Sequence, residues 1–263
     1  MDTSTLELNR SNRIKGEAGF LFIDDGGSGD IPVVFLHSFA GNTTHWKNQL
    51  KHLREGRRAI AFDFRAHGKS DSSSTHSYSA EALAGDVAAV VDSLDLGRFI
   101  LVGHSQGGSA AIAYADTHPT RVAGLVLVST PGKSPEEISK PVISSLESSS
   151  YQKVMDDYMK QLVEGAKPEV SAQVNEDVKK LSKPASISFI KGLFEFDPTE
   201  MITRYSGPKL IVATSGEGKQ PNALVNQAPK IPKKIIDGTS HWPQLDKPEE
   251  FNRLLDEFLK EIK

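Results

Sequence analysis

Residues 99–108, Phe-Ile-Leu-Val-Gly-His-Ser-Gln-Gly-Gly, join a short apolar run to a stretch of small, helix-forming residues. Within them, residues 103–107 fit the pattern G-x-S-x-G and are named the elbow. In this setting the pattern predicts a strand, a sharp turn and a helix. The central serine of such a turn has a strained backbone, so glycines are needed two residues to either side of it. The turn would hold the Ser105 hydroxyl at the carboxyl edge of a sheet, where the helix N-terminus favours developing negative charge.

The composition excludes several function classes. The 263 residues include no cysteine, so disulfides, thiolate metal sites and a cysteine nucleophile are absent. With 31 Lys+Arg and 34 Asp+Glu the net charge is −3, and no basic block occurs, so nucleic acid is not an expected partner. The N-terminal stretch lacks the apolar core of a signal peptide, and no run approaches the roughly 18 apolar residues of a membrane span. We expect a cytoplasmic protein with no membrane partner.

Apolar runs alternate with helical segments along most of the chain, which is typical of a parallel sheet covered by helices on both faces. The expected strands are Gly19–Ile23, Pro32–Leu36, Arg58–Phe62, Phe99–Val102, Val122–Val128, Lys209–Ala213 and Lys233–Ile236. The expected helices are Thr44–Glu55, Ser79–Leu94, Gln106–Thr117 and Pro248–Ile262. Ser79 is a good start signal for its helix, and Asp246 or Lys247 would cap the last one.

The alternation stops between Ser129 and Gly207, where the sequence becomes polar and helical. Apolar residues there recur at the spacing of one helix face: Val154, Met155, Tyr158, Met159 and Leu162. We interpret residues 130–206 as a helical cap over the carboxyl edge of the sheet, where the sites of α/β proteins lie. Residues 1–129 and 207–263 would then form the core domain.

A serine nucleophile needs a base within hydrogen-bonding reach. His241 lies in a loop between the last expected strand and the last helix, which returns it to the carboxyl edge that holds Ser105. His104 should point away from the serine, and His67 is expected to tie a loop together. The remaining histidines, apart from His37, lie in helical or surface contexts: His45, His52, His76 and His118.

The third member should be a carboxylate that orients the imidazole and stabilises its cation. Glu217 follows the strand Lys209–Ala213 at the point where the chain leaves the sheet, so it is the expected acid. Asp197 and Asp237 are the competitors. Asp197 belongs to the cap and would serve as a helix cap, whereas Asp237 lies only four residues before the base and is badly placed to reach around its ring.

The oxyanion needs two backbone donors. One is the N–H of Gln106, the residue after the nucleophile. The other is expected in the loop after Pro32–Leu36, at the N–H of Phe39, two residues past His37. We expect His37 to hold this loop and not to act as a second base. The loss of one such donor typically costs about 2.7–4 kcal/mol of transition-state stabilisation.

Four ordered motifs together resemble the α/β-hydrolase superfamily, and within it the capped bacterial esterases, lactonases and carbon–carbon bond hydrolases. The motifs are residues 37–41 (HSFAG), 63–70 (DFRAHGKS), 103–108 (GHSQGG) and 238–243 (GTSHWP). The resemblance covers the chain from about Phe20 to the end, except for the cap. It implies an α/β-hydrolase fold, with a mostly parallel eight-stranded sheet, helices on both faces and a helical cap inserted after strand 6. It also implies an acyl-enzyme mechanism with no cofactor and no metal.

Three positions depart from the usual family pattern. Ser38 stands in place of a glycine in the oxyanion loop, Ala66 replaces the first glycine of Arg-Gly-His-Gly, and Glu217 stands where an aspartate is usual. These changes leave the class intact but affect loop geometry and rate. Serine at position 105 argues against the haloalkane dehalogenases and epoxide hydrolases of this fold, which use aspartate there.

The motifs favour a carboxylic-ester hydrolase acting on a small or medium acyl substrate. Ser105 would attack the carbonyl, His241 would carry the proton and Glu217 would orient His241. The same three residues could instead support lactone opening, carbon–carbon hydrolysis or acyl transfer, which differ mainly in the cap and in water access. A third hypothesis, suggested by the three departures, is a ligand-binding or receptor-like protein whose reactive residues are slow or vestigial.

Overall fold

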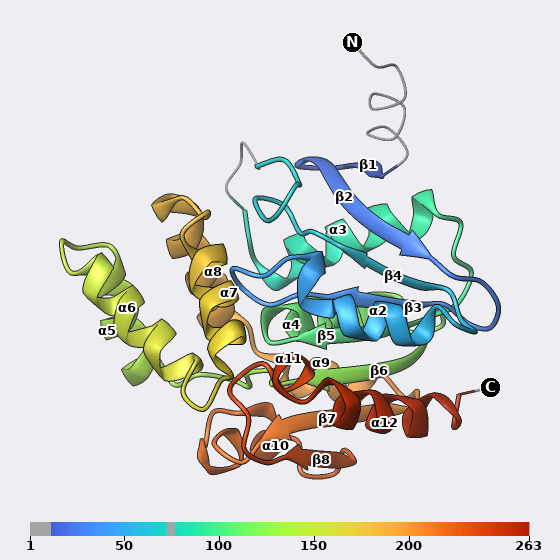
Figure 1. Ribbon diagram of the computed structural model, residues 1–263. Helices are drawn as coiled ribbons and strands as arrows, with labels where there is room; N and C mark the ends of the chain where they lie inside the picture. Colours follow the sequence, from blue (N-terminus) through green and yellow to red (C-terminus); the bar gives the residue numbers. More distant parts are fainter. Residues whose placement is uncertain (1–11, 73–76, 263) are drawn as a thin grey trace.

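The computed structural model describes residues 12–72 and 77–262, which form an eight-stranded sheet in the order β1-β2-β4-β3-β5-β6-β7-β8 (Figure 1). The strands are β1 (Arg13–Gly16), β2 (Gly19–Gly26), β3 (Val33–Leu36), β4 (Ala59–Phe62), β5 (Phe99–His104), β6 (Val122–Val128), β7 (Lys209–Thr214) and β8 (Lys233–Ile236). β2 is antiparallel to β1 and to β4, and the other neighbours are parallel. The predicted fold class is confirmed. The expectations for the N-terminal residues 1–11 and for His76 lie outside the described residues.

β1 is a correction to the sequence analysis, which predicts no strand there. Only Ile14 of its four residues is buried, so the strand leaves no apolar run in the sequence. The other strands coincide with the predicted runs, apart from small shifts at their ends and the extension of β2 to Gly26.

Helices cover both faces of the sheet (Figure 1). α3 (Ala80–Ser93) and α4 (Gln106–Thr117) lie on one face, whereas α2 (Lys47–Leu53) and α12 (Pro248–Leu259) lie on the other. The strand period of two sorts the side chains of β5 between the two cores: Leu101 packs with the α3–α4 cluster, while Ile100 and Val102 pack with the α2–α12 cluster. Both sides of β5 are therefore buried, and only its carboxyl end is left for chemistry.

Residues 130–206, named the insertion, connect β6 to β7 and are helical, as the sequence predicts. The helices are α5 (Glu136–Leu146), α6 (Tyr151–Leu162), α7 (Pro168–Val178), α8 (Lys183–Glu195) and α9 (Pro198–Arg204). Figure 1 shows α5–α8 gathered as a group beside the sheet. α9 packs on α4, one of the helices that cover a face of the sheet. None of the helices in the described part of the chain has the length and apolarity that crossing a membrane requires.

Three shorter helices lie near the carboxyl edge of the sheet. They are η1 (Thr43–Trp46), η2 (Glu217–Lys219) and α11 (Pro243–Asp246). A fourth short helix, α10 (Leu224–Gln227), precedes β8. The expected helix Thr44–Glu55 is thus divided into η1 and α2. The final helix begins at Pro248 with Lys247 as its N-cap residue, so Asp246 is free for another role.

Candidate active site

The elbow has the geometry that its sequence predicts. Ser105 stands between β5 and α4 with φ 53° and ψ −118°, a left-handed conformation that is strained for a residue with a side chain. Its N–H donates to Val128 O of β6 at 2.8 Å, and its carbonyl accepts from the N–H groups of Gly108 and Ser109. Strand and helix therefore hold the strained residue from both sides.

Gly103 and Gly107 are required because backbone atoms occupy the space of a side chain. A Cβ on Gly103 would lie 2.4 Å from the carbonyl oxygen of Gly107. A Cβ on Gly107 would lie 2.5 Å from Leu36 O and 2.6 Å from His37 O. The elbow is thus packed directly on the end of β3, where the predicted oxyanion loop begins.

The structure brings the predicted base and acid together. His241 Nδ1 lies 2.8 Å from Glu217 Oε1, and the two side chains are 14% and 12% exposed. Glu217 begins η2, directly after β7, and its Oε2 accepts the backbone N–H of Thr214 at 2.9 Å. One carboxylate oxygen of Glu217 is thus anchored to the end of β7, while the other faces His241 Nδ1. The second ring nitrogen of His241, Nε2, is therefore the one that can accept a proton from a nucleophile.

His104 joins the base to the elbow, a role that the sequence analysis does not foresee. Its Nε2–H donates to the carbonyl oxygen of His241 at 2.7 Å, and the two imidazole rings lie 4.9 Å apart between centroids. Gln244 Nε2 donates to the other ring nitrogen at 3.2 Å. Because His104 directly precedes Ser105, this contact places the predicted nucleophile and base at the same edge of the sheet.

The two competing carboxylates do not contact His241. Asp197 caps α9, accepting the Thr199 N–H at 3.0 Å, and pairs with Lys133 at 2.8 Å. Asp237 accepts a hydrogen bond from the Ser215 hydroxyl. Of the three carboxylates considered, Glu217 is the one in place to orient the imidazole.

The loop that carries Phe39 is fixed by hydrogen bonds that leave one amide open. Ala40 N–H donates to His67 Nε2 at 3.1 Å, and Gly41 N–H donates to Ser38 O at 3.0 Å. Within residues 12–72 and 77–262, the backbone N–H groups of Phe39 and Gln106 donate to no other group. These are the two amides that the sequence analysis names as oxyanion donors.

His37 and His67 hold loops, as expected. The Phe64 N–H donates to His37 Nε2 at 2.9 Å, and His67 Nδ1 lies 3.0 Å from Arg65 O. Burial lowers the pKa of His37 well below its usual value and lowers that of His67 to about 4, with repulsion from neighbouring imidazoles adding to both shifts. Burial also lowers the pKa of His104 well below its usual value. All three imidazoles are therefore neutral at pH 7, and their hydrogen bonds hold the neighbouring segments in place.

We expect His67 to make the folded protein less stable as the pH falls from 6.5 towards 4. In this window the unfolded chain binds a proton at His67 that the folded protein does not, so the free energy of unfolding falls with pH. The shift is equivalent to about 3 kcal/mol. Urea unfolding of the wild type and of His67→Asn, measured at several pH values, checks this.

The H67N variant should have the shallower pH dependence between these limits. Burial raises the pKa of Asp63 and Asp86, which opposes the trend but is common to both proteins. Equal pH slopes for the two proteins would show that His67 is not the neutral buried group described here.

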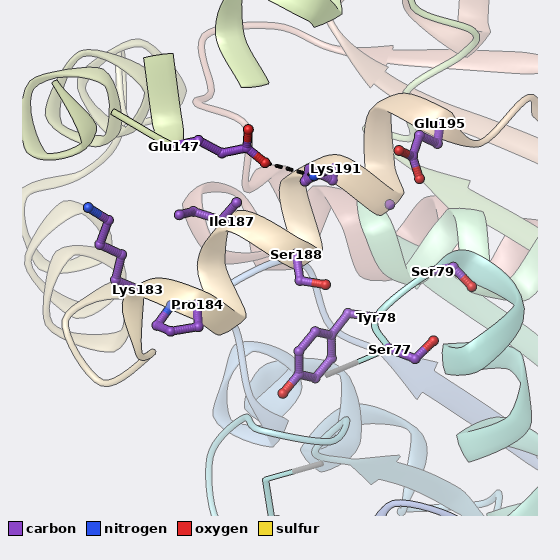
Figure 2. Close-up of a pocket in the computed structure, with 11 residues that line it drawn as sticks. Ser77, Tyr78, Ser79, Glu147, Lys183, Pro184, Ile187, Ser188, Lys191 and Glu195 are labelled. Carbon is purple, nitrogen blue, oxygen red and sulfur yellow. Dashed lines mark hydrogen bonds and ion pairs between the residues drawn. The ribbon is translucent and has the colours of Figure 1, made fainter. Parts of the chain in front are cut away.

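A pocket of about 580 Å³ lies between α8, residues 77–79 and Glu147, and its lining includes none of the candidate site residues (Figure 2). Glu147 and Lys191 pair across it at 2.7 Å. Its wall includes Tyr78, whose ring stacks on Phe189 with centroids 4.2 Å apart. The Phe189 ring lies 6.2 Å from that of Phe39, so these aromatic rings separate the pocket from the predicted oxyanion loop.

Ser105 itself is 5% exposed. Its neighbour Gln106 donates through Nε2 to the carbonyl oxygens of Tyr78 and Phe189 at 3.4 and 3.2 Å. The residue that follows the predicted nucleophile is thus bonded to α8 of the insertion. The described residues contain no group of three or more His, Asp or Glu side chains arranged to hold a metal ion.

The comparisons with known proteins agree with the observed fold. The family model described as alpha/beta hydrolase fold matches residues 31–174. Epoxide hydrolase 3 of Xenopus tropicalis is 27% identical to this chain, over 94% of the chain and 78% of that protein.

Two solved structures share the fold across nearly the whole chain. A thermophilic esterase from Thermogutta terrifontis has a TM-score of 0.81 and 26% identity, covering 95% of this chain and 97% of that one. An N-acyl homoserine lactone degrading enzyme has a TM-score of 0.80 and 25% identity, covering 94% and 99%. The relatives thus include hydrolases that differ in the bond they cleave.

Proposed function

Because this chain belongs to the α/β-hydrolase fold family, we propose that it is a serine hydrolase that cleaves a carboxylic ester of a small or medium acyl substrate. The observation that carries the proposal is the 2.8 Å contact between His241 Nδ1 and Glu217 Oε1, at the same sheet edge as the strained Ser105. In this order the imidazole takes the proton of the alcohol, while the carboxylate orients the imidazole and stabilises its charged form. The epoxide hydrolase relative does not displace the proposal, since the elbow of this chain carries serine.

The proposed reaction has two halves. In the first, Ser105 Oγ attacks the ester carbonyl carbon while its proton passes to His241 Nε2. The carbonyl electron pair moves to the oxygen, which accepts hydrogen bonds from the Phe39 and Gln106 N–H groups. Collapse of this intermediate expels the alcohol, which takes the proton from His241 and leaves an acyl group on Ser105.

In the second half, water replaces the alcohol. His241 takes a proton from the water as its oxygen attacks the acyl carbon, and the same two amides stabilise the oxyanion. Release of the carboxylic acid returns the proton to Ser105. Glu217 stays ionised throughout: it accepts the Nδ1–H hydrogen bond and stabilises the imidazolium that forms twice per turnover.

We expect Glu217→Gln to lower kcat for ester hydrolysis by about 10²- to 10⁴-fold, with a smaller change in KM. The amide keeps the size of the carboxylate but removes the charge, and it can turn an N–H towards His241 Nδ1, which selects the wrong tautomer. Steady-state kinetics with p-nitrophenyl butyrate checks this. Asp237→Asn is the control, because Asp237 bonds to Ser215 and should lose little activity. An equal loss in both variants would remove Glu217 from its assigned role.

The substrate class is tested with p-nitrophenyl esters of increasing acyl length. The proposal requires turnover of at least one short or medium ester, with a pre-steady-state burst wherever release of the acid limits the rate. If no ester is cleaved and Ser105 reacts with no acylating probe, the third hypothesis of the sequence analysis, a binding protein, is favoured instead.

Lactone opening is the alternative supported by a specific finding, the likeness to an N-acyl homoserine lactone degrading enzyme. A lactone is a cyclic ester, so the same residues would open it by the same steps. Comparison of kcat/KM for an N-acyl homoserine lactone and for the linear ester of the same acyl chain separates the two activities.

We also propose that the insertion acts as a cap on a core formed by residues 1–129 and 207–263. The support is that Phe189 of α8 lies beside the two residues of the predicted oxyanion hole. Its ring is next to that of Phe39, and its carbonyl oxygen accepts a hydrogen bond from the Gln106 side chain. Substitutions at Phe189 should change KM and the preferred acyl length more than they change kcat.

A further inference from the structure

Asp246, at the end of α11, is a buried carboxylate with three short hydrogen bonds. Its Oδ2 accepts from the backbone N–H of Ser240 at 2.8 Å and from the Ser240 hydroxyl at 2.6 Å. Its Oδ1 accepts from the backbone N–H of Lys167 at 2.9 Å. The residue is only 2% exposed, and its three partners are all uncharged groups. Burial of a charge is costly unless such bonds compensate, so the charge at this position needs an explanation.

Its partners show what the carboxylate joins. Ser240 directly precedes His241, and residues 238–242 are named the base loop. Lys167 lies in the connection between α6 and α7, within the insertion. At the other end of the same connection, Leu162 O accepts the His241 N–H at 3.1 Å. The base loop is thus tied to this connection at two adjacent residues: His241 by one direct backbone bond, and Ser240 through the Asp246 bridge.

We propose that Asp246 is a positioning residue for His241. It fixes the base loop and links it to the insertion, so that the position of the base depends on the position of the insertion. The inference rests on the proposed function, because it assigns a consequence to moving His241. A negative charge bonded to Ser240, the residue before the base, also stabilises the imidazolium formed when Ser105 attacks. Asp246 acts through Ser240 and through its charge, and it is not placed against the substrate.

Other charged groups surround the base loop and are unchanged in the test below. Glu217 and the neutral His104 face His241 directly, and Asp237 lies at the end of β8 against Ser215. Lys247, next to Asp246, pairs with Glu250 at 3.6 Å. In the Asp246→Asn variant described below, these groups keep their charges, and only the charge of Asp246 is removed.

The bridge to the insertion is tested by a matched pair of variants at one residue. Lys167 has φ −60° and ψ 148°, which suit proline, so Lys167→Pro removes the N–H donor with little backbone strain. Lys167→Ala removes the side chain and its charge but keeps the N–H. We expect K167P to lower kcat for p-nitrophenyl butyrate several-fold and to speed amide hydrogen exchange at Ser240 and His241, whereas K167A behaves as wild type in both measurements.

The charge is tested with Asp246→Asn. An asparagine oxygen can still accept from Ser240, but its NH₂ group then faces the Lys167 N–H. We expect kcat to fall by about 10- to 100-fold with a smaller change in KM. The acid limb of kcat/KM against pH should move to lower pH, because the imidazolium loses a stabilising negative neighbour.

Asp63→Asn is the control for general loss of stability. Asp63 is 1% exposed and accepts two backbone N–H groups, from Thr43 at 2.6 Å and Lys69 at 2.8 Å, but it has no hydrogen bond to the base loop. D63N should lower stability and leave the acid limb in place. A D246N protein with wild-type kcat and pH profile, or a K167P protein matching K167A in rate and exchange, would overturn the proposal.

The two proposals fail separately. A wild-type protein without esterase or lactonase activity would refute the proposed function, and the exchange rates of Ser240 and His241 in K167P and K167A would still decide whether the bridge holds the loop. If D246N does not fold, the K167 pair decides both the kinetic and the structural part.

Discussion

Replacing Ser105 with alanine is expected to lower kcat/KM for p-nitrophenyl butyrate by about 10⁴-fold or more. The variant keeps His241, Glu217 and the two open amides, so it can still bind the ester and polarise its carbonyl, but it has no oxygen to form the acyl-enzyme. The residual rate is therefore direct attack by water in the preorganised site. The fold should persist, because alanine can occupy the same strained backbone held by β6 and α4.

Ser109→Ala is the matched control. Ser109 lies one turn further along α4, and its buried hydroxyl has no hydrogen-bond partner among the residues that the structure describes. The S109A protein should retain nearly full activity and stability. Retention of more than a tenth of wild-type activity by S105A, in a preparation free of other esterases, would contradict the assignment of the nucleophile.

Gly107→Ala is expected to destabilise the protein by about 3 kcal/mol. The new methyl group would lie 2.5 Å from Leu36 O and 2.6 Å from His37 O, and backbone atoms cannot move aside as a side chain can. The elbow must separate from the end of β3, which also displaces the loop that carries Phe39. Urea unfolding followed by circular dichroism gives the loss of stability, and the surviving folded protein should show a reduced kcat.

Gly97→Ala is the comparison, because a Cβ at Gly97 meets no atom within 4 Å and its φ is not positive. Its free energy of unfolding should stay within about 0.5 kcal/mol of wild type. Equal effects of the two substitutions would mean that the close packing of the elbow on β3 is not a requirement of the fold.

The elbow could be predicted from the sequence because its determinants are local. The apolar run of β5, the glycines at 103 and 107 and the small residues of α4 each act within a few positions, and α4 has the predicted bounds. Glu217 was also accessible, by a topological argument. The carboxyl ends of parallel strands meet at one edge, so the residues that follow β7 and β8 come together there.

The parts that the sequence did not reveal depend on long-range contacts. His104 bonds to a carbonyl 137 residues away, and Asp246 bonds to Lys167, 79 residues away. For Asp246 the local pattern even suggested a different role, the N-cap of the final helix, because an acidic residue before Pro248 is a start signal. β1 was missed for a different reason, since its contacts are local. It buries only one side chain and therefore leaves no apolar pattern in the sequence, and its pairing with β2 is what makes it a strand.

Ala66 shows how one departure from the family pattern is accommodated. Its φ is 63°, a left-handed conformation that a glycine would adopt at lower cost. The loop keeps this shape because the Ala66 N–H donates to Asp71 O and the following His67 bonds to Ala40. Ser38, the departure in the oxyanion loop, donates a hydrogen bond from its hydroxyl to Phe39 O.

Reaction with a fluorophosphonate ester, followed by mass spectrometry of the tryptic digest, tests the nucleophile assignment most directly. Cleavage after Arg98 and Arg121 gives the peptide Phe99–Arg121, which holds both Ser105 and Ser109, and fragmentation separates the two positions. The account predicts one adduct per protein, on Ser105, absent from S105A and formed much more slowly in Glu217→Gln. An unlabelled Ser105 in a protein that hydrolyses esters, or inactivation by an adduct at another residue, would contradict it.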